Sequence, residues 1–139
     1  MIQFLTFTIS DQQFAINIQN ICEIKEFEDL TIAEAPGSPW FVEGITYFRQ
    51  TPIGLCNLSK FFAQNQIQNG MVIITENTHE TLLGLIVEKV NDIISIDEDE
   101  IEQYSKVFFK PNYTNIITSV VKHNEGLYNV VNIDELHDL

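Results

Sequence analysis

The residues that could perform catalysis are scattered along this chain. Its three histidines, His79, His123 and His137, are far apart, and each falls in a predicted turn or near the end of the sequence. A metal centre needs several such groups at defined spacing, so we expect solvated loop histidines rather than ligands. Phosphate-binding glycine loops and nucleophile elbows are also missing from the sequence. The sequence therefore favours an interaction module over an enzyme, and it predicts no metal and no cofactor.

The carboxylates are numerous, but they form no recognisable motif. Asp97 and Asp99 alternate as in a calcium loop, yet the glycine that turns an EF-hand loop and its closing glutamate are missing. We expect a solvated turn or helix start there. With 7 basic and 20 acidic residues, the chain has a net charge of −13, which repels phosphate backbones and anionic membranes. This charge argues against nucleic acid as a partner.

The length and composition predict one compact domain, comprising residues 1–139. A chain of this size buries about two-thirds of its unfolded surface, so it needs no disulfide or structural metal to fold. The two cysteines, Cys22 and Cys56, lie in apolar runs and are expected to be buried, reduced thiols rather than a disulfide or a nucleophile. No apolar run is long enough to cross a bilayer, and Met1 leads directly into strand-like sequence. We expect a cytoplasmic protein without direct membrane insertion.

The only arginine in the chain, Arg49, lies in the most distinctive stretch, residues 36–62. Two prolines exclude a helix at its start, and Gly44 then opens an apolar run that alternates poorly and is typical of a buried strand. Arg49 ends this run. A second apolar rise follows, and either Asn57 or Ser59 is suited to cap a short helix.

The rest of the chain predicts three hairpins and a terminal helix. The hairpins span residues 2–18, with a polar turn at 10–13; residues 71–87, with a turn at 76–80; and residues 113–132, with a turn at 122–126. The acidic segment 25–35 is expected to be a loop with a brief edge strand at 30–32, residues 87–96 are expected to be buried, and Asn132 is suited to begin the terminal helix. This pattern predicts a mostly β protein built from partly closed barrels.

These motifs together resemble the CheW family of chemotaxis coupling proteins over nearly the whole chain. The family glycine and arginine of the central turn correspond to Gly44 and Arg49, and its glutamate in an earlier segment corresponds to Glu23. The chain departs from the family pattern at three positions. It has Gln50 where the family has glycine, Gly54 where it has proline, and Asn57 where it commonly has aspartate.

The resemblance implies a fold of two SH3-like five-stranded β-barrel subdomains packed around a shared core. It also implies a non-enzymatic adaptor that binds the regulatory domain of a CheA-type histidine kinase and the cytoplasmic tip of a chemoreceptor. The implied partner-binding residues are Arg49 and Gly44 at the central turn, Glu23 and Ile21 near it, and Val87 in a receptor groove between the barrels.

Structural alternatives stand beside these assignments. In these alternatives, Gly44 serves only to permit a backbone angle, and Val87 serves only to fill the core. The charge of Arg49 is expected either to reach a turn surface or to pair with a neighbouring carboxylate such as Glu23.

Two alternatives also concern function. For the adaptor, two pathways are open: flagellar chemotaxis or, given Trp40 and the pair Phe61 and Phe62, a pilus-linked pathway for twitching motility. A different class is a small β-barrel hydrolase or ligand-binding domain that has converged on the same apolar runs. Co-purification with a histidine kinase would support the adaptor, whereas turnover of a substrate would support the enzyme.

Overall fold

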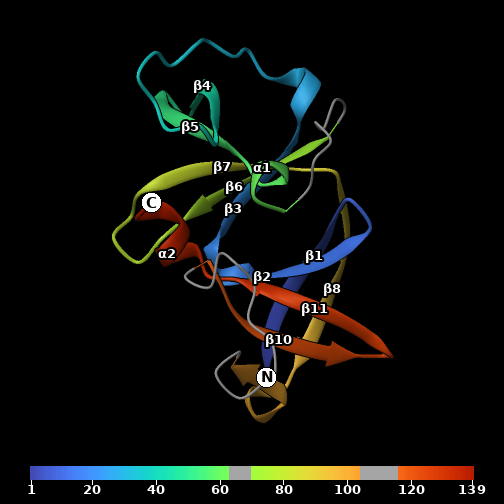
Figure 1. Ribbon diagram of the computed structural model, residues 1–139. Coiled ribbons are helices and arrows are strands. Elements are labelled where there is room, and N and C mark those ends of the chain that lie inside the picture. The colour runs from blue at the N-terminus through green and yellow to red at the C-terminus, as the bar shows by residue number, and fades with distance from the viewer. Residues whose placement is uncertain (63–69, 104–115) are drawn as a thin grey trace.

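The computed structural model describes residues 1–62, 70–103 and 116–139 (Figure 1). The strands are β1 (Ile2–Ile9), β2 (Gln12–Asn17), β3 (Ile21–Glu26), β4 (Val42–Phe48), β5 (Thr51–Asn57), β6 (Met71–Glu76), β7 (Leu82–Val87), β8 (Lys89–Ile96), β9 (Ile101–Gln103), β10 (Ile117–His123) and β11 (Gly126–Val131). The helical segments are α1 (Ser59–Phe62), α2 (Ile133–His137) and the 3-10 turns η1 (Ile18–Asn20), η2 (Phe27–Asp29) and η3 (Glu98–Glu100).

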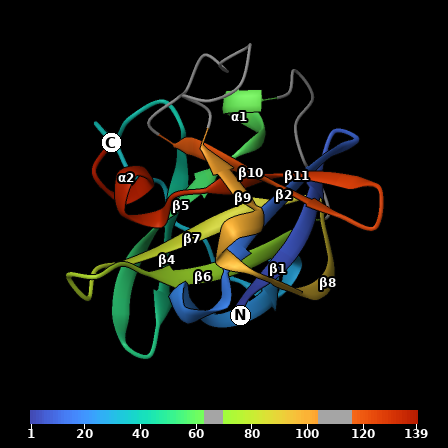
Figure 2. The same ribbon diagram turned by 90° about the horizontal axis from the view of Figure 1, so that it is seen from below.

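The strands form two sheets. One has the order β3-β6-β7-β5-β4, and the other has the order β8-β1-β2-β11-β10-β9. Figure 1 shows the five-stranded sheet above and the six-stranded sheet below, and Figure 2 shows the same strands from below. The predicted fold, mostly β with two SH3-like subdomains, is confirmed. The second sheet has six strands rather than five because the short β9 pairs with β10.

The hydrophobic core has three parts. The interior of the five-stranded barrel contains Phe48, Ile53, Leu55, Val72, Ile74 and Ile86. The interior of the six-stranded barrel contains Phe4, Ala15, Ile94, Ile96 and Val121. A larger shared core draws on both sheets and on α2, including Phe7, Phe14, Leu58, Ile73, Leu85, Val87, Ile133 and Leu136. Each buried aliphatic or aromatic side chain contributes about 1.5–3 kcal/mol to the free energy of unfolding. The shared core therefore holds the two barrels together.

All three predicted hairpins are present within the described residues, and two of them have turns that are tighter than expected. The β1–β2 turn is Ser10 and Asp11, and the β10–β11 turn is Asn124 and Glu125. In both turns the two residues have positive φ, the pattern of a type I′ turn, which matches the twist of paired strands. Residues 12–13, 122–123 and 126, which the sequence assigns to turns, belong to strands.

Buried and more exposed side chains alternate more regularly in β4 than the sequence suggests. In β4 the inward residues are Gly44, Thr46 and Phe48, and the hydroxyl of Thr46 donates to the carbonyl of Thr31 at 2.8 Å. This hydrogen bond lets a polar residue occupy an inward position. In β8 the prediction of continuous burial is wrong, because Ile93 is 59% exposed.

The segment before β4 differs from the prediction as well. The brief edge strand expected at residues 30–32 is absent. A single bridge between Ala33 and Ile45 takes its place, and Leu30 and Ile32 pack against the five-stranded barrel interior.

Both predicted helices form, and each is capped by asparagine. The Asn57 Oδ1 atom accepts from the Ser59 backbone N–H at 3.0 Å, and the Asn132 Oδ1 atom accepts from the Glu135 N–H at 3.1 Å. Helix α2 follows the six-stranded sheet but also contacts the other one, because Asp134 Oδ1 accepts from the Thr78 N–H at 3.0 Å. Within the described residues, no helix is long and apolar enough to cross a membrane.

Candidate partner-binding site

Arg49 lies in the two-residue turn between β4 and β5 of the five-stranded barrel (Figure 1). The strands remain paired up to Phe48 and Thr51, so only Arg49 and Gln50 form the turn. Their φ values are 49° and 67°. Residues other than glycine, asparagine and aspartate enter this region at a cost of about 1–2 kcal/mol. A tight hairpin therefore fixes the exposed Arg49, at a cost in backbone strain.

The charge of Arg49 has no carboxylate partner within the described residues. Its guanidinium carbon lies 4.6 Å from the centroid of the Phe48 ring, a cation–π contact. Glu23 pairs instead with Lys25, at 3.3 Å. Of the two alternatives for Arg49, exposure at the turn is therefore observed and pairing with Glu23 is wrong. The guanidinium remains available to an incoming carboxylate.

Strand β3, which carries Ile21 and Glu23, lies at the opposite edge of the five-stranded sheet from β4. The β3–β6 register shifts between Ile21 and Glu23, so Cys22 is the extra residue of a β-bulge. Burial and then the charge of Glu76 raise the pKa of Cys22, whereas the charge of Arg49 lowers it. Arg49 is therefore within electrostatic reach of the bulge. In β3, Ile21 and Glu23 stand on either side of Cys22, and Ile21 is partly buried against the shared core.

Gly44 is a packing residue. A Cβ atom at this position would lie 2.5 Å from the carbonyl oxygen of Ala33 and 2.7 Å from Cγ2 of Ile32. The approach is this close because Ala33 and Ile45 exchange two backbone hydrogen bonds, at 2.9 and 2.8 Å, which draw the preceding segment over β4. Glycine is needed here for space, not for an unusual backbone angle.

Val87 and the cysteines contribute to the interior. Val87 is 0% exposed and belongs to the shared core, so it offers no surface to a partner. Cys56 is also 0% exposed, and burial raises the pKa of its thiol to about 12. Cys22 is half-buried, and both thiols are free. The prediction of buried, reduced thiols thus holds for Cys56 and in part for Cys22.

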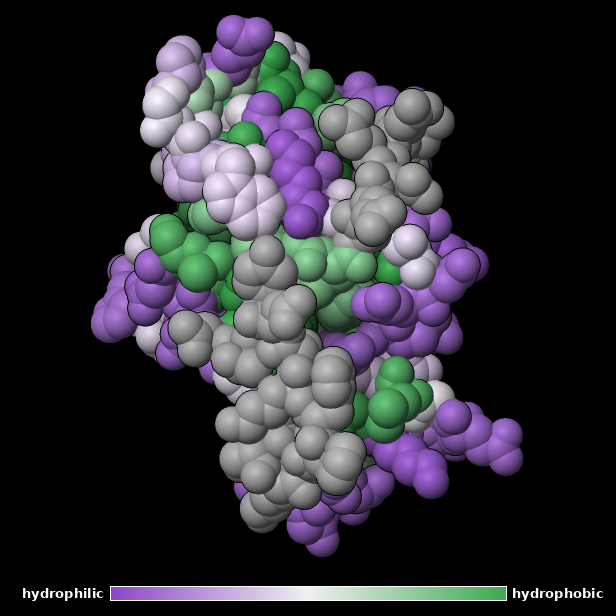
Figure 3. All heavy atoms as spheres, in the orientation of Figure 1, coloured by the Kyte–Doolittle hydropathy of each residue, from purple (hydrophilic) through white to green (hydrophobic). Residues whose placement is uncertain are grey.

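A polar cluster that the sequence does not predict holds α1 against β4. The Asn57 amide and the Lys60 ammonium both lie 3.0 Å from Glu43 Oε1, and the Lys60 ammonium donates to the carbonyl of Trp40 at 3.0 Å. The hydrogen bond from Asn57, more than the charge of Lys60, lowers the pKa of Glu43 against the effect of burial. Trp40 is 56% exposed, and its ring packs on that of Phe61 with the ring centroids 5.0 Å apart. Figure 3 shows hydrophobic side chains gathered in this region between the barrels.

The histidines do not converge on a site. His79 is exposed and His123 is half-buried in β10, but His137 differs from the prediction of a solvated histidine. It lies half-buried on α2, with Nε2 3.0 Å from Thr75 Oγ1. Among the described residues, the one group of three potential metal ligands is the exposed trio Glu26, Glu28 and Asp29, whose ligand atoms lie within 4.8 Å of one another. Exposed trios of this kind are common on acidic surfaces.

Comparison with known proteins gives a consistent result. The model of the CheW-like domain matches residues 3–139. The chemotaxis protein CheW of Klebsiella aerogenes is 25% identical over 136 residues, covering 96% of this chain and 80% of that protein. The chemotaxis protein CheW of Thermotoga maritima is 28% identical over 126 residues, covering 90% of this chain and 76% of that protein.

A solved structure shares the fold. The scaffolding protein TtCheW from Thermoanaerobacter tengcongensis superimposes with a TM-score of 0.82 at 24% identity, covering 94% of this chain and 88% of that chain. Proteins of the matched family are scaffolds rather than enzymes. The chain belongs to the CheW-like domain family and is a non-enzymatic adaptor of chemotaxis signalling.

Proposed function

We propose that this chain couples a chemoreceptor to a CheA-type histidine kinase. One surface would bind the regulatory domain of the kinase, and another the cytoplasmic tip of the receptor. The observation that carries the proposal is the family match across residues 3–139. The geometry of Arg49 supports it, because an unpaired guanidinium held at a hairpin tip is suited to bidentate binding of a carboxylate.

The five residues that the sequence nominates act in two ways under this proposal. Arg49 makes the direct contact, and Glu23 and Ile21 contribute from strand β3, where Cys22 lies between them within electrostatic reach of Arg49. Gly44 and Val87 act indirectly, because they are buried and hold the barrel and the shared core in shape.

Reconstitution tests the proposal directly. The purified chain is mixed with a CheA-type kinase and the signalling fragment of a receptor, and sedimentation measures whether the three assemble. We expect a ternary complex that needs this chain, together with a change in kinase autophosphorylation. Failure to bind either protein, or turnover of a substrate by the isolated chain, would favour the hydrolase or ligand-binding alternative instead.

The net charge of −13 also predicts the charge of the partner surfaces. Their contact surfaces should be basic, so association should slow as salt rises from about 0.05 to 0.5 M, a range in which the Debye length shortens severalfold. A strain that lacks the gene, scored for both swimming and twitching, would assign the adaptor to a flagellar or a pilus pathway.

A further inference from the structure

A second surface feature lies on the six-stranded barrel, in a different sheet from Arg49. One cavity of about 390 Å³ is lined by Met1, Ile2, Gln3, Asn17, Ile18, Gln19 and Glu98. Another of about 280 Å³ is lined by residues of β1, β2, β10, β11 and α2. Ile2 and Asn17 line both cavities, so the two adjoin, and we call them together the amide groove.

The groove exists because the wall of the barrel opens at this point. Strands β2 and β11 pair in parallel only at Phe14 with Asn129 and at Ala15 with Val130. In the described part of the sheet, β2 then continues to Asn17 without a partner on that side. Apolar side chains of Ile2, Phe4, Ile101 and Val130 are left along the opening.

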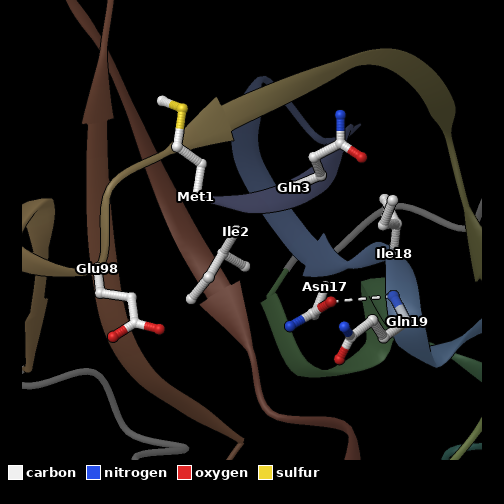
Figure 4. Close-up of a pocket in the computed structure, with 7 residues that line it drawn as sticks. All are labelled: Met1, Ile2, Gln3, Asn17, Ile18, Gln19 and Glu98. Carbon is white, nitrogen blue, oxygen red and sulfur yellow. Dashed lines mark hydrogen bonds between the residues drawn. The ribbon is translucent and has the colours of Figure 1, made fainter.

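The groove is lined by side-chain amides with unused hydrogen-bonding capacity. Asn17 uses only its oxygen, which accepts from the Gln19 N–H at 2.9 Å, and Asn20 uses only its nitrogen, which donates to the Glu76 carbonyl at 3.1 Å. The side chains of Gln3 and Gln19 have no partner among the described residues. In Figure 4, Asn17 and Gln19 lie on one side of Ile2 and the Glu98 carboxylate lies on the other. Side-chain amides offer a donor and an acceptor each, which matches the N–H and C=O groups of an extended main chain.

Among the described residues, the charged side chains that line the groove are acidic, and Met1, which carries the α-ammonium, also lines the first cavity. Glu98 lines the first cavity and Asp134 lines the second, and among the described residues no lysine, arginine or histidine lines either one. The same ends of the groove border the acidic turn η3 and the acidic helix α2. A cationic ligand is therefore favoured over an anionic or neutral one.

We propose that the amide groove binds an extended, basic peptide segment of a partner protein. The side-chain amides would pair with the peptide main chain, alternate apolar side chains would contact Ile2 and Val130, and lysine or arginine would approach Glu98 and Asp134. An extended peptide places alternate side chains on opposite faces, so a segment in which basic and apolar residues alternate fits this arrangement.

A nuclear magnetic resonance titration of the full chain tests the proposal. The probe is a short blocked peptide in which lysine and valine alternate, and the control is the same peptide with glutamate in place of lysine. We expect saturable shifts of the side-chain amide signals of Gln3, Asn17, Gln19 and Asn20 with the basic peptide, and none with the acidic one. Shifts spread evenly over other acidic surfaces, such as Glu26 to Asp29, would overturn the proposal.

Matched variants separate specific binding from general attraction. Glu98→Gln and Asp99→Asn remove the same charge from the same turn, but only Glu98 lines the groove. We expect about fivefold weaker binding from Glu98→Gln and less than twofold from Asp99→Asn. Gln3→Ala should weaken binding severalfold, whereas Gln12→Ala, at the exposed start of β2, should not.

Equal losses of affinity for Glu98→Gln and Asp99→Asn, or for Gln3→Ala and Gln12→Ala, would contradict specific binding in the amide groove. Because the variants lie on the six-stranded barrel and Arg49 does not, loss of peptide binding with normal assembly of kinase and receptor would leave the proposed coupling intact.

Discussion

The base and the tip of the β4–β5 hairpin lie only a few residues apart in sequence but have opposite surroundings. At the base, Gly44 is buried beneath Ala33, with no space for a methyl group. At the tip, Arg49 is exposed, strained and without a carboxylate partner among the described residues. The family pattern assigns both residues to partner binding. The structure separates them, because only a residue with a free side chain can contact a partner directly.

This contrast teaches that one hairpin combines a stability site with an interaction site. A substitution at the base should change the free energy of unfolding and affect binding only through the folded fraction. A substitution at the tip should do the reverse. Four predictions test this contrast, ordered from the largest expected effect to the smallest.

The largest effect is expected at the base. Gly44→Ala forces a methyl group against the Ala33 carbonyl, which is backbone and cannot rotate away. Overpacking typically costs about 1–3 kcal/mol, and we expect the upper end of that range here, measured as a lower urea midpoint. Gly54→Ala is the matched control on the same hairpin, since its Cβ would lie 3.6 Å from Leu83 Cδ1, an ordinary contact. If both variants lost the same stability, the special role of Gly44 would be wrong.

At the tip, Arg49→Ala should weaken binding to the kinase and receptor by about 2 kcal/mol or more, as arginine hot spots do. Its free energy of unfolding should change by at most about 1 kcal/mol, because the residue is exposed and makes only a cation–π contact. Arg49→Lys should restore binding in part, since lysine keeps the charge but loses the bidentate fork.

Lys89→Ala provides the control for charge alone, because Lys89 is also an exposed cation but lies on β8. An unchanged affinity in Arg49→Ala, or an equal loss in Lys89→Ala, would remove the support for Arg49 as the contact residue.

The third prediction concerns His137, whose protonation should change the free energy of unfolding but not partner binding. The Thr75 hydroxyl donates to the Leu83 carbonyl at 2.8 Å, so it can only accept from His137, and the proton of the neutral ring must be on Nε2. The other ring nitrogen, Nδ1, is buried without a partner among the described residues. Burial lowers the pKa of His137, opposed by the charges of Asp134 and Asp138. Protonation would place an unpaired N–H in the interior.

The sign of the pH dependence follows from this shift. The unfolded chain, with a histidine pKa near 6.5, binds the proton more strongly than the folded protein does. The stabilisation is therefore complete above about pH 6.5 and is lost as the pH falls through the folded pKa, at a slope of at most about 1.4 kcal/mol per pH unit. His137→Gln keeps a donor to Thr75 without titrating, so its urea midpoint should vary less between about pH 7 and 5.5.

Partner binding through Arg49 should be indifferent to this titration while the chain remains folded, because arginine stays charged throughout. His79→Gln, at an exposed position, is the control for replacing a histidine outside the interior. The same pH dependence in His137→Gln and in the unsubstituted chain would refute the assignment.

The smallest effect concerns backbone strain at the tip. Gln50 has a φ of 67°, which glycine adopts without a steric penalty. Gln50→Gly should therefore raise the free energy of unfolding by about 0.5–1 kcal/mol and leave partner binding unchanged. Asp11→Gly in the equivalent β1–β2 turn should gain less, because aspartate tolerates this region better. A loss of stability in Gln50→Gly would show that the glutamine side chain supports the turn.

Local patterns in the sequence were sufficient to predict the three hairpins, the two strands around Arg49 and the capped helices. Hydrophobic alternation and polar turn residues act over a few residues, and so do the asparagine caps Asn57 and Asn132, so a linear reading detects them. The family resemblance added the barrel arrangement, which periodicity does not contain. Arg49 was identified for a similar reason, since one arginine in a chain with a net charge of −13 stands out from composition alone.

The surroundings of each residue depended on contacts between distant parts of the chain. The sequence does not show that Ala33 lies on Gly44, that Thr75 meets His137 across 62 positions, or that Val87 lies in the core between barrels. It also did not show that Glu23 pairs with Lys25 rather than Arg49, because that outcome depends on the β3 bulge and on the direction of a tight turn. Burial and pairing are set by packing between sheets, so only the tertiary structure decided which nominated residues can reach a partner.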